Sequence, residues 1–210
     1  QMKSPLYIAA GPKALRHLQE NGLQLADIRA MLGASGGPKW LVLNQLDRLL
    51  APRLAADPLV NMDLLGTSIG SWRFACYTQP DPLAAIDRFE EAYFEQAYSR
   101  KPSPVEISQV CSRILESLLE GQHRAIVSNS QRRLHTIANR CRPVMLDRNG
   151  EPSKVPLGAA ALMNVMGRHQ LRHFFERILF APPSSQLPFH PAIFRQENLQ
   201  LATDNLHQAL

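Results

Sequence analysis

Two short stretches, residues 28–39 (IRAMLGASGGPK) and 62–71 (MDLLGTSIGS), decide the fold. Each opens with a short apolar run, turns at glycines and continues into a segment with an apolar stripe. A short apolar run that ends at glycines is typical of a buried strand, and the stripes that follow have helical periodicity. The repeated order of strand, turn and helix predicts a parallel sheet in an α/β layer fold.

The rest of the chain is predicted to be mainly helical. Periodicity and capping residues predict helices over residues 12–20, from Pro38 to Pro52, 69–77, from Pro82 onward, 105–119, 159–177 and 197–210. A further strand is expected at 134–138, a turn at Arg148-Asn149-Gly150 and a proline-rich loop at 181–191. Since 210 residues with 45% hydrophobic content can bury one core, we expect a single domain over residues 1–210.

Composition indicates a soluble, cytoplasmic protein. The three cysteines, Cys76, Cys111 and Cys141, are odd in number and widely spaced, as expected of free thiols in a reducing compartment. No stretch approaches the roughly 18 apolar residues of a membrane span. Metal-ligand spacing, the phosphate-binding P-loop and the dinucleotide GxGxxG pattern are all missing from the sequence, so we expect no metal and no cofactor.

The formal net charge is +5, and much of the excess lies between His123 and Arg148. Such a run could contact an anionic membrane surface or a nucleic acid. Nucleic-acid binding is disfavoured, because no aromatic residues interleave with the arginines to stack on bases. A solvated face whose acidic partners lie elsewhere in the chain is the favoured interpretation, with peripheral membrane contact kept open.

Gly66-Thr67-Ser68-Ile69-Gly70 is a GxSxG sequence between a predicted strand and a predicted helix. This context is the one that a nucleophile elbow requires, because the strained turn exposes the serine hydroxyl while small neighbours let strand and helix approach. The positive end of the helix would then lie beneath the serine and favour developing negative charge. The pattern makes Ser68 the candidate nucleophile.

Gly33-Ala34-Ser35-Gly36-Gly37 also matches GxSxG in the same context. Acyl transfer needs both a nucleophile and preorganised N–H donors for the oxyanion, and a glycine-rich loop that opens a helix suits the second task. Ile69 supplies the bulky position between serine and second glycine that an elbow favours, whereas Gly36 leaves that position empty. We therefore assign the oxyanion hole to the backbone N–H groups of Gly36 and Gly37.

Together, residues 32–39 (LGASGGPK) and 65–71 (LGTSIGS) resemble the patatin-like phospholipase family, in which a glycine-rich loop ends in a basic residue and a GxSxG serine follows one βα unit later. The resemblance implies a three-layer α/β/α sandwich with a mainly parallel sheet, a Ser-Asp dyad without histidine or metal, and hydrolysis of phospholipids or other acyl lipids. Lys39 stands where the family usually has arginine, and Ser35 where it usually has glycine. We expect Lys39 to support the loop or to bind an anionic head group.

The resemblance also implies a general base, the aspartate of an Asp-Gly-Gly or Asp-Gly-Ala motif, yet no Asp-Gly pair occurs in these 210 residues. We therefore expect the aspartate segment to follow Leu210, with residues 1–210 forming the N-terminal and central part of the domain. Two alternatives remain. One is an α/β-hydrolase esterase with a Ser68-Asp147-His190 triad, whose chain order fits that class. The other is an inactive acyl-lipid-binding or interaction domain.

Overall fold

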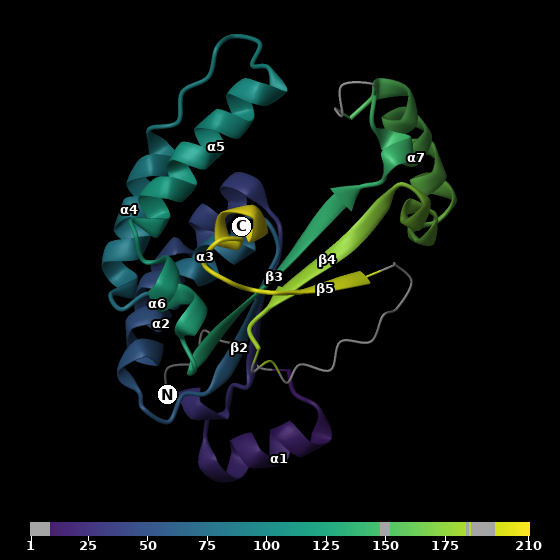
Figure 1. The fold of residues 1–210 in the computed structure, drawn as a ribbon. Helices are drawn as coiled ribbons and strands as arrows, with labels where there is room; N and C mark the ends of the chain where they lie inside the picture. Colours follow the sequence, from purple (N-terminus) through teal and green to yellow (C-terminus); the bar gives the residue numbers. More distant parts are fainter. Residues whose placement is uncertain (1–8, 148–151, 184, 186–195) are drawn as a thin grey trace.

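The computed structural model describes residues 9–147, 152–183, 185 and 196–210, and in them the chain has a mixed α/β fold built on one five-stranded sheet (Figure 1). The strands are β1 (Ala30–Gly33), β2 (Met62–Gly66), β3 (Arg132–Cys141), β4 (Phe175–Ala181) and β5 (Gln196–Gln200). They lie in this order across the sheet, and all neighbours are parallel except β3 and β4, which are antiparallel. The mainly parallel sheet expected from the sequence is therefore confirmed.

Helices connect and cover these strands. The α-helices are α1 (Pro12–Asn21), α2 (Asn44–Ala56), α3 (Ile69–Tyr77), α4 (Pro82–Phe94), α5 (Pro104–Leu119), α6 (His123–Ser128), α7 (Lys154–Met166) and α8 (Leu206–Ala209). Short 3-10 turns occur at η1 (Leu25–Asp27), η2 (Gly37–Leu43), η3 (Pro143–Met145) and η4 (Arg168–His173). Within the described ranges, no helix is long and apolar enough to cross a membrane.

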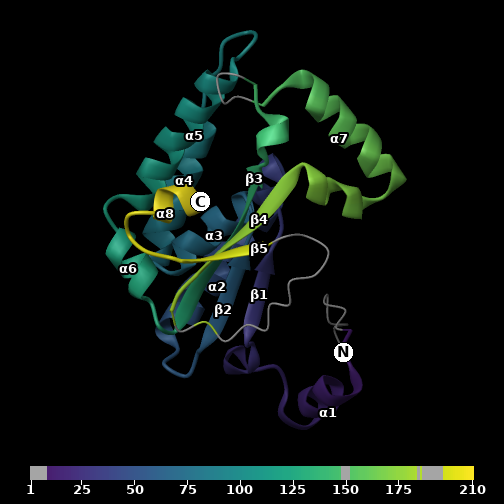
Figure 2. The same ribbon diagram turned by 45° about the vertical axis from the view of Figure 1, so that its right-hand side comes forward.

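Helices α2 to α6 and α8 gather on one side of the sheet, with α3 against its centre (Figures 1 and 2). Helix α3 contacts β1, β2 and β3 and also packs on α2, α4 and α5. Helix α7 instead projects beyond the ends of β3 and β4, away from this layer (Figure 2). The described residues thus contain one clear helical layer, and a second layer on the other face of the sheet stays a prediction.

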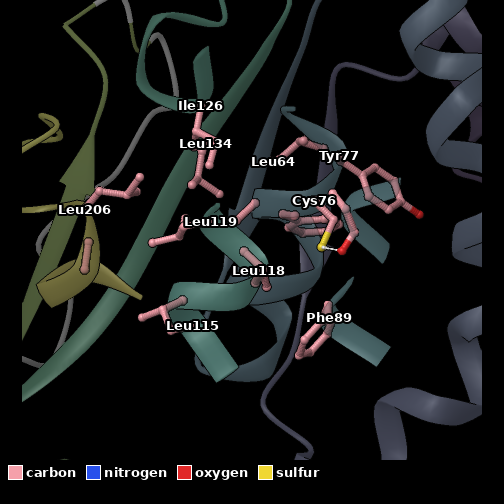
Figure 3. Packing of buried hydrophobic residues seen from close by; sticks show 14 of the residues in the cluster. Leu64, Cys76, Tyr77, Phe89, Leu115, Leu118, Leu119, Ile126, Leu134 and Leu206 are labelled. Carbon is pink, nitrogen blue, oxygen red and sulfur yellow. Dashed lines mark hydrogen bonds between the residues drawn. The ribbon is translucent and has the colours of Figure 1, made fainter. Parts of the chain in front are cut away.

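The hydrophobic core lies between the sheet and this helical layer. Leu64 of β2 and Leu134 of β3 pack with Phe89 of α4, Leu118 of α5 and Ile126 of α6, as seen in Figure 3. All five side chains are almost completely buried. Burying a side chain of this size contributes roughly 1.5–3 kcal/mol, so this cluster is what holds the helices, and the turns that precede them, in place.

The predicted helix over residues 159–177 was wrong in its extent. Helix α7 ends at Met166, because Gly167 adopts a φ of 154° that does not continue a helix. After η4 the chain forms β4, in which Ile178 and Phe180 pair with β3 and enter the core. Aromatic and β-branched residues that can pack on a sheet favour the strand, and that packing outweighs helical periodicity.

The predicted helix over residues 197–210 was also wrong. Residues 196–200 form β5, parallel to β4, and only Leu206–Ala209 is helical. Leu199 lies opposite Phe180 and packs against the core, which is a contact that no local propensity reveals. Pro52 likewise lies inside α2 rather than at its end. Of the other expectations, the 148–150 turn and most of the 181–191 loop lie outside the described residues.

Candidate active site

The two glycine-rich turns lie side by side at the carboxyl edge of the sheet. Strands β1 and β2 are parallel neighbours, with Gly33 opposite Gly66. The N–H of Thr67 donates to the carbonyl of Gly33 at 3.0 Å, so the strand pairing continues into the turns. Parallel strands end at the same edge of a sheet, and ligands of open α/β sheets bind at that edge. The two predicted site segments therefore belong to one region of the surface.

Close packing explains the glycines of this junction. A Cβ on Gly70 would lie 2.2 Å from the carbonyl oxygen of Gly33, and a Cβ on Gly66 would lie 2.4 Å from the Cα of Ser71. The backbones of the two turns touch directly, with no room for a methyl group. The relative position of the serine turn and the glycine loop is thus fixed by backbone contact rather than by adjustable side chains.

Ser68 occupies a backbone conformation that is rare for a residue with a side chain. Its φ is 52° and its ψ is −132°, and it directly precedes α3. Such a conformation costs of order 1–3 kcal/mol and persists only where the surroundings impose it, as the flanking glycine contacts do here. The side chain is exposed at the N-terminus of α3, where the first N–H groups of the helix have no intrahelical acceptors. The hydroxyl therefore lies where developing negative charge is favoured.

Ser35 occupies a different environment. Its hydroxyl donates to the carbonyl of Thr67 at 3.4 Å, a long bond that crosses from the glycine loop to the serine turn. Beyond it, Gly36 and Gly37 are partly exposed, and Gly37 has a φ of 51°, a left-handed conformation that glycine adopts without strain. The carbonyl of Gly36 accepts from the N–H of Lys39 at 3.3 Å as η2 begins. Ser35 thus braces the junction instead of standing at a helix N-terminus.

Lys39 is exposed, while the next residue anchors the loop. No carboxylate in the described part of the chain forms an ion pair with Lys39. Trp40 is buried and stacks on Phe89 of α4, with ring centroids 4.4 Å apart. The loop is therefore fixed by an aromatic side chain, and the lysine head group is left available to a ligand.

A buried polar cluster joins the helices that follow the two turns. Arg73 of α3 donates two hydrogen bonds to Asp47 of α2, at 2.6 and 2.5 Å, and the hydroxyl of Tyr77 donates to the same carboxylate at 2.8 Å. Although burial lowers the pKa of Arg73, its hydrogen bonds and charge interaction with Asp47 raise that pKa overall. Burial and the neighbouring Asp47 charge raise the pKa of Tyr77. This cluster holds α2 and α3 in register and so fixes the turns above them.

A general base for Ser68 is not found within the described residues. No carboxylate or imidazole there hydrogen-bonds to the Ser68 hydroxyl. Thr136 of β3 lies opposite Gly66, where β2 ends. From there β3 continues five residues further, and Asp147 comes only after the following turn, η3. His190 lies outside the described residues. The structure thus brings the turn that carries Ser68 against the glycine loop at Gly33 and Ser35. The roles of Gly36, Gly37 and Lys39 and the triad alternative stay predictions.

His135, a fully buried histidine of β3, was not expected from the sequence. Its Nδ1 lies 3.1 Å from the carbonyl of Arg133, its Nε2 lies 2.7 Å from the Ser185 hydroxyl, and Asp63 is 3.8 Å away. Burial lowers the pKa of His135 and thus favours the neutral ring. The alternation along β3 indicated this position, because Arg133 and His135 share the face opposite Leu134, and two polar side chains on one face of a central strand need partners.

The arginine-rich run between His123 and Arg148 is largely engaged within the molecule. Arg132 is buried and donates to the carbonyls of Tyr77 and Leu54, while Arg133 pairs with Asp63. Arg140 and Arg142 pair with acidic residues of the neighbouring strands, Glu176 and Glu197. Acidic partners elsewhere in the chain therefore pair with three of the six arginines of this run, Arg133, Arg140 and Arg142.

Within the described ranges, no group of three or more histidine, cysteine, aspartate or glutamate side chains is placed to hold a metal ion. No protein-family model, curated protein or solved structure matches this chain. The candidate site is therefore supported by its geometry alone.

Proposed function

We propose that this chain carries the nucleophile and oxyanion hole of a serine-dependent lipid acyl hydrolase, a phospholipase or esterase of the patatin-like type. The observation that supports this most strongly is the backbone of Ser68, which has a φ of 52° between β2 and α3 and is flanked by glycines whose Cβ positions are blocked by backbone. A strained serine exposed at a helix N-terminus is the arrangement of a nucleophile elbow, in which a neighbouring general base activates the hydroxyl for attack.

In the proposed reaction the Ser68 Oγ attacks the carbonyl carbon of an ester while a general base takes its proton. The carbonyl oxygen becomes an oxyanion, which the N–H groups of Gly36 and Gly37 stabilise from the adjoining turn. Collapse of this intermediate breaks the ester C–O bond, and the leaving alcohol takes the proton that the base holds, which leaves an acyl-serine. The base then takes a proton from water as that water attacks the acyl carbon, and returns it to the Ser68 Oγ as the fatty acid is released. Lys39 supports the loop or binds an anionic head group.

The family resemblance assigns the base to the aspartate of an Asp-Gly motif, which these 210 residues do not contain. It also supports the three-layer sandwich and an acyl lipid as substrate. The three cysteines are all free, which supports a reducing compartment such as the cytoplasm. The proposal requires no metal and no organic cofactor.

The test is to label the full-length protein with a fluorophosphonate, which phosphonylates activated serines, and to map the adduct by mass spectrometry. We expect the adduct on the peptide that contains Ser68. Ser68→Ala should abolish labelling and lower esterase turnover by about a thousandfold or more, because both chemical steps pass through this oxygen.

Ser35→Ala is the matched control, since Ser35 belongs to the other GxSxG turn and only braces the junction. It should retain labelling of Ser68 and most of the turnover. An adduct on Ser35, or none on either serine, would contradict the assignment. In the same assay His190→Ala should have little effect, whereas complete loss of activity would favour the Ser-His-Asp triad.

A further inference from the structure

Helix α7 is apolar along its whole length yet almost entirely exposed. Ala160 is its only buried residue, while Val155, Leu162, Val165 and Met166 are 81%, 68%, 84% and 70% exposed. A helix that is hydrophobic on every side is normally buried in a core or in a membrane. The exposure of four large apolar side chains on one short helix therefore indicates a surface that another phase or molecule covers.

These side chains form one continuous apolar face. Val155, Leu162 and Met166 are separated by seven and four residues, the spacing that places side chains on the same side of a helix. Leu157 points elsewhere, lining a groove with the first turns of α5. In both ribbon views α7 stands apart from the sheet and projects into solvent (Figures 1 and 2). Nothing else in the described part of the chain covers this face.

The charged side chains of the segment that contains α7 and η4 are all cationic. Residues 152–175 contain Lys154, Arg168 and Arg172 and no aspartate or glutamate. All three cations are exposed, and no carboxylate of the described residues forms an ion pair with them. By contrast, Arg140 near the end of β3 and Arg142 just after it are paired with Glu176. The cations that border α7 are therefore available to an external anion.

The pattern fits a lipid surface better than another protein. At 13 residues α7 is about 20 Å long, too short to span a bilayer but suited to lying in its interface. A second copy of the chain would bring two acid-free cationic segments together, which is repulsive. An anionic bilayer supplies both an apolar layer for the exposed face and negative head groups for the flanking cations.

We propose that α7 and η4 form a docking surface for anionic membranes, with Val155, Leu162 and Met166 inserted among the acyl chains. Lys154, Arg168 and Arg172 contact the head groups. The surface follows the carboxyl end of β3, the same end of the parallel strands at which Ser68 follows β2. Docking would thus present lipid to the edge of the sheet that carries the proposed nucleophile, although membrane binding itself does not depend on hydrolysis.

The test is sedimentation with vesicles of phosphatidylcholine alone or with 30 mol% phosphatidylglycerol added. The full-length protein carries Ser68→Ala throughout, so that turnover cannot alter the lipid. We expect binding to the anionic vesicles and little binding to the neutral ones. Leu162→Ser with Met166→Ser should weaken binding by at least about tenfold, because two large side chains no longer enter the apolar layer. Arg168→Gln with Arg172→Gln should also weaken it by about tenfold and reduce its salt dependence.

Matched controls lie at the opposite end of the sheet. Leu59→Ser removes an apolar side chain that is 74% exposed in the turn before β2. Arg16→Gln with Arg124→Gln removes two exposed charges from α1 and α6. Both control variants should bind as the parent does, and thermal melting should be unchanged in every variant.

Three results would overturn the proposal. One is failure of the parent protein to bind anionic vesicles, and another is equal binding by the α7 variants and their controls. The third is a concentration-dependent dimer that Leu162→Ser abolishes, because a second copy would then be what covers the helix. None of these results bears on the fluorophosphonate assignment of Ser68, so failure of membrane docking and failure of the proposed hydrolase function can be distinguished.

Discussion

Helices α3 and α7 are both rich in apolar residues, yet eight of the nine residues of α3 are buried and only one residue of α7 is. Helix α3 packs on three strands and three helices, whereas α7 packs mainly on the short turns η3 and η4. The difference shows that an apolar helix needs a covering surface, but that its composition does not say which surface covers it. The chain buries α3 in its own core, and we propose that a membrane buries α7.

The largest expected difference in stability between the two helices comes from replacing the glycine of each with alanine. Gly70→Ala would place a Cβ 2.2 Å from the Gly33 carbonyl oxygen, so α3 must shift and the free energy of unfolding should fall by about 3 kcal/mol or more. Gly158→Ala in α7 meets nothing within 4 Å, and the better helix former should raise stability by about 0.5–1 kcal/mol. Urea unfolding of both variants measures the two effects. A mild loss at Gly70 would disprove the close approach of the two turns.

Replacing an arginine in each of the two regions should give a difference in stability that is nearly as large. Arg73→Met leaves Asp47 buried without its cation and should cost about 3–5 kcal/mol, while Arg168→Met removes an exposed charge and should change stability by less than about 0.5 kcal/mol. Asp47→Leu combined with Arg73→Met should recover part of the loss, because no unpaired charge remains. Chemical denaturation supplies all three values. A double variant no better than Arg73→Met would mean that packing, not charge, sets the cost.

The smallest expected difference is in how stability depends on pH when one of two histidines, His135 or His169, is replaced. Burial lowers the pKa of His135 in the folded protein, so the unfolded chain takes up a proton more readily as the pH falls below about 6.5. Stability should therefore decline in that range, with a slope from this residue of at most about 1.4 kcal/mol per pH unit. His135→Gln should flatten the slope between pH 7 and 5, whereas His169→Gln, exposed beside α7, serves as the control. Equal slopes in both variants would exclude His135 as the cause.

Local sequence patterns predicted the elements that carry the candidate site. The strand expected over residues 62–65 is observed as β2, one residue longer, and the helix over residues 69–77 is observed as expected, because a short apolar run, a glycine turn and a helical stripe are local signals. The same reasoning failed at β4 and β5, where pairing with a distant strand decides the structure. The cationic residues also differ between regions. Arg133, Arg140 and Arg142 of the arginine-rich run pair with carboxylates, whereas the cations of the acid-free segment around α7 are exposed.

The sequence by itself determined that Ser68 follows a strand and precedes a helix, and that a second glycine-rich turn comes one strand earlier. Only the tertiary structure decided that these turns touch, because the register of β1 on β2 and the contact of Gly70 with the Gly33 carbonyl join residues over 30 positions apart. The exposure of α7 was likewise undecided by its composition. Periodicity reports which face of a segment is apolar, while burial depends on which other parts of the chain reach that face.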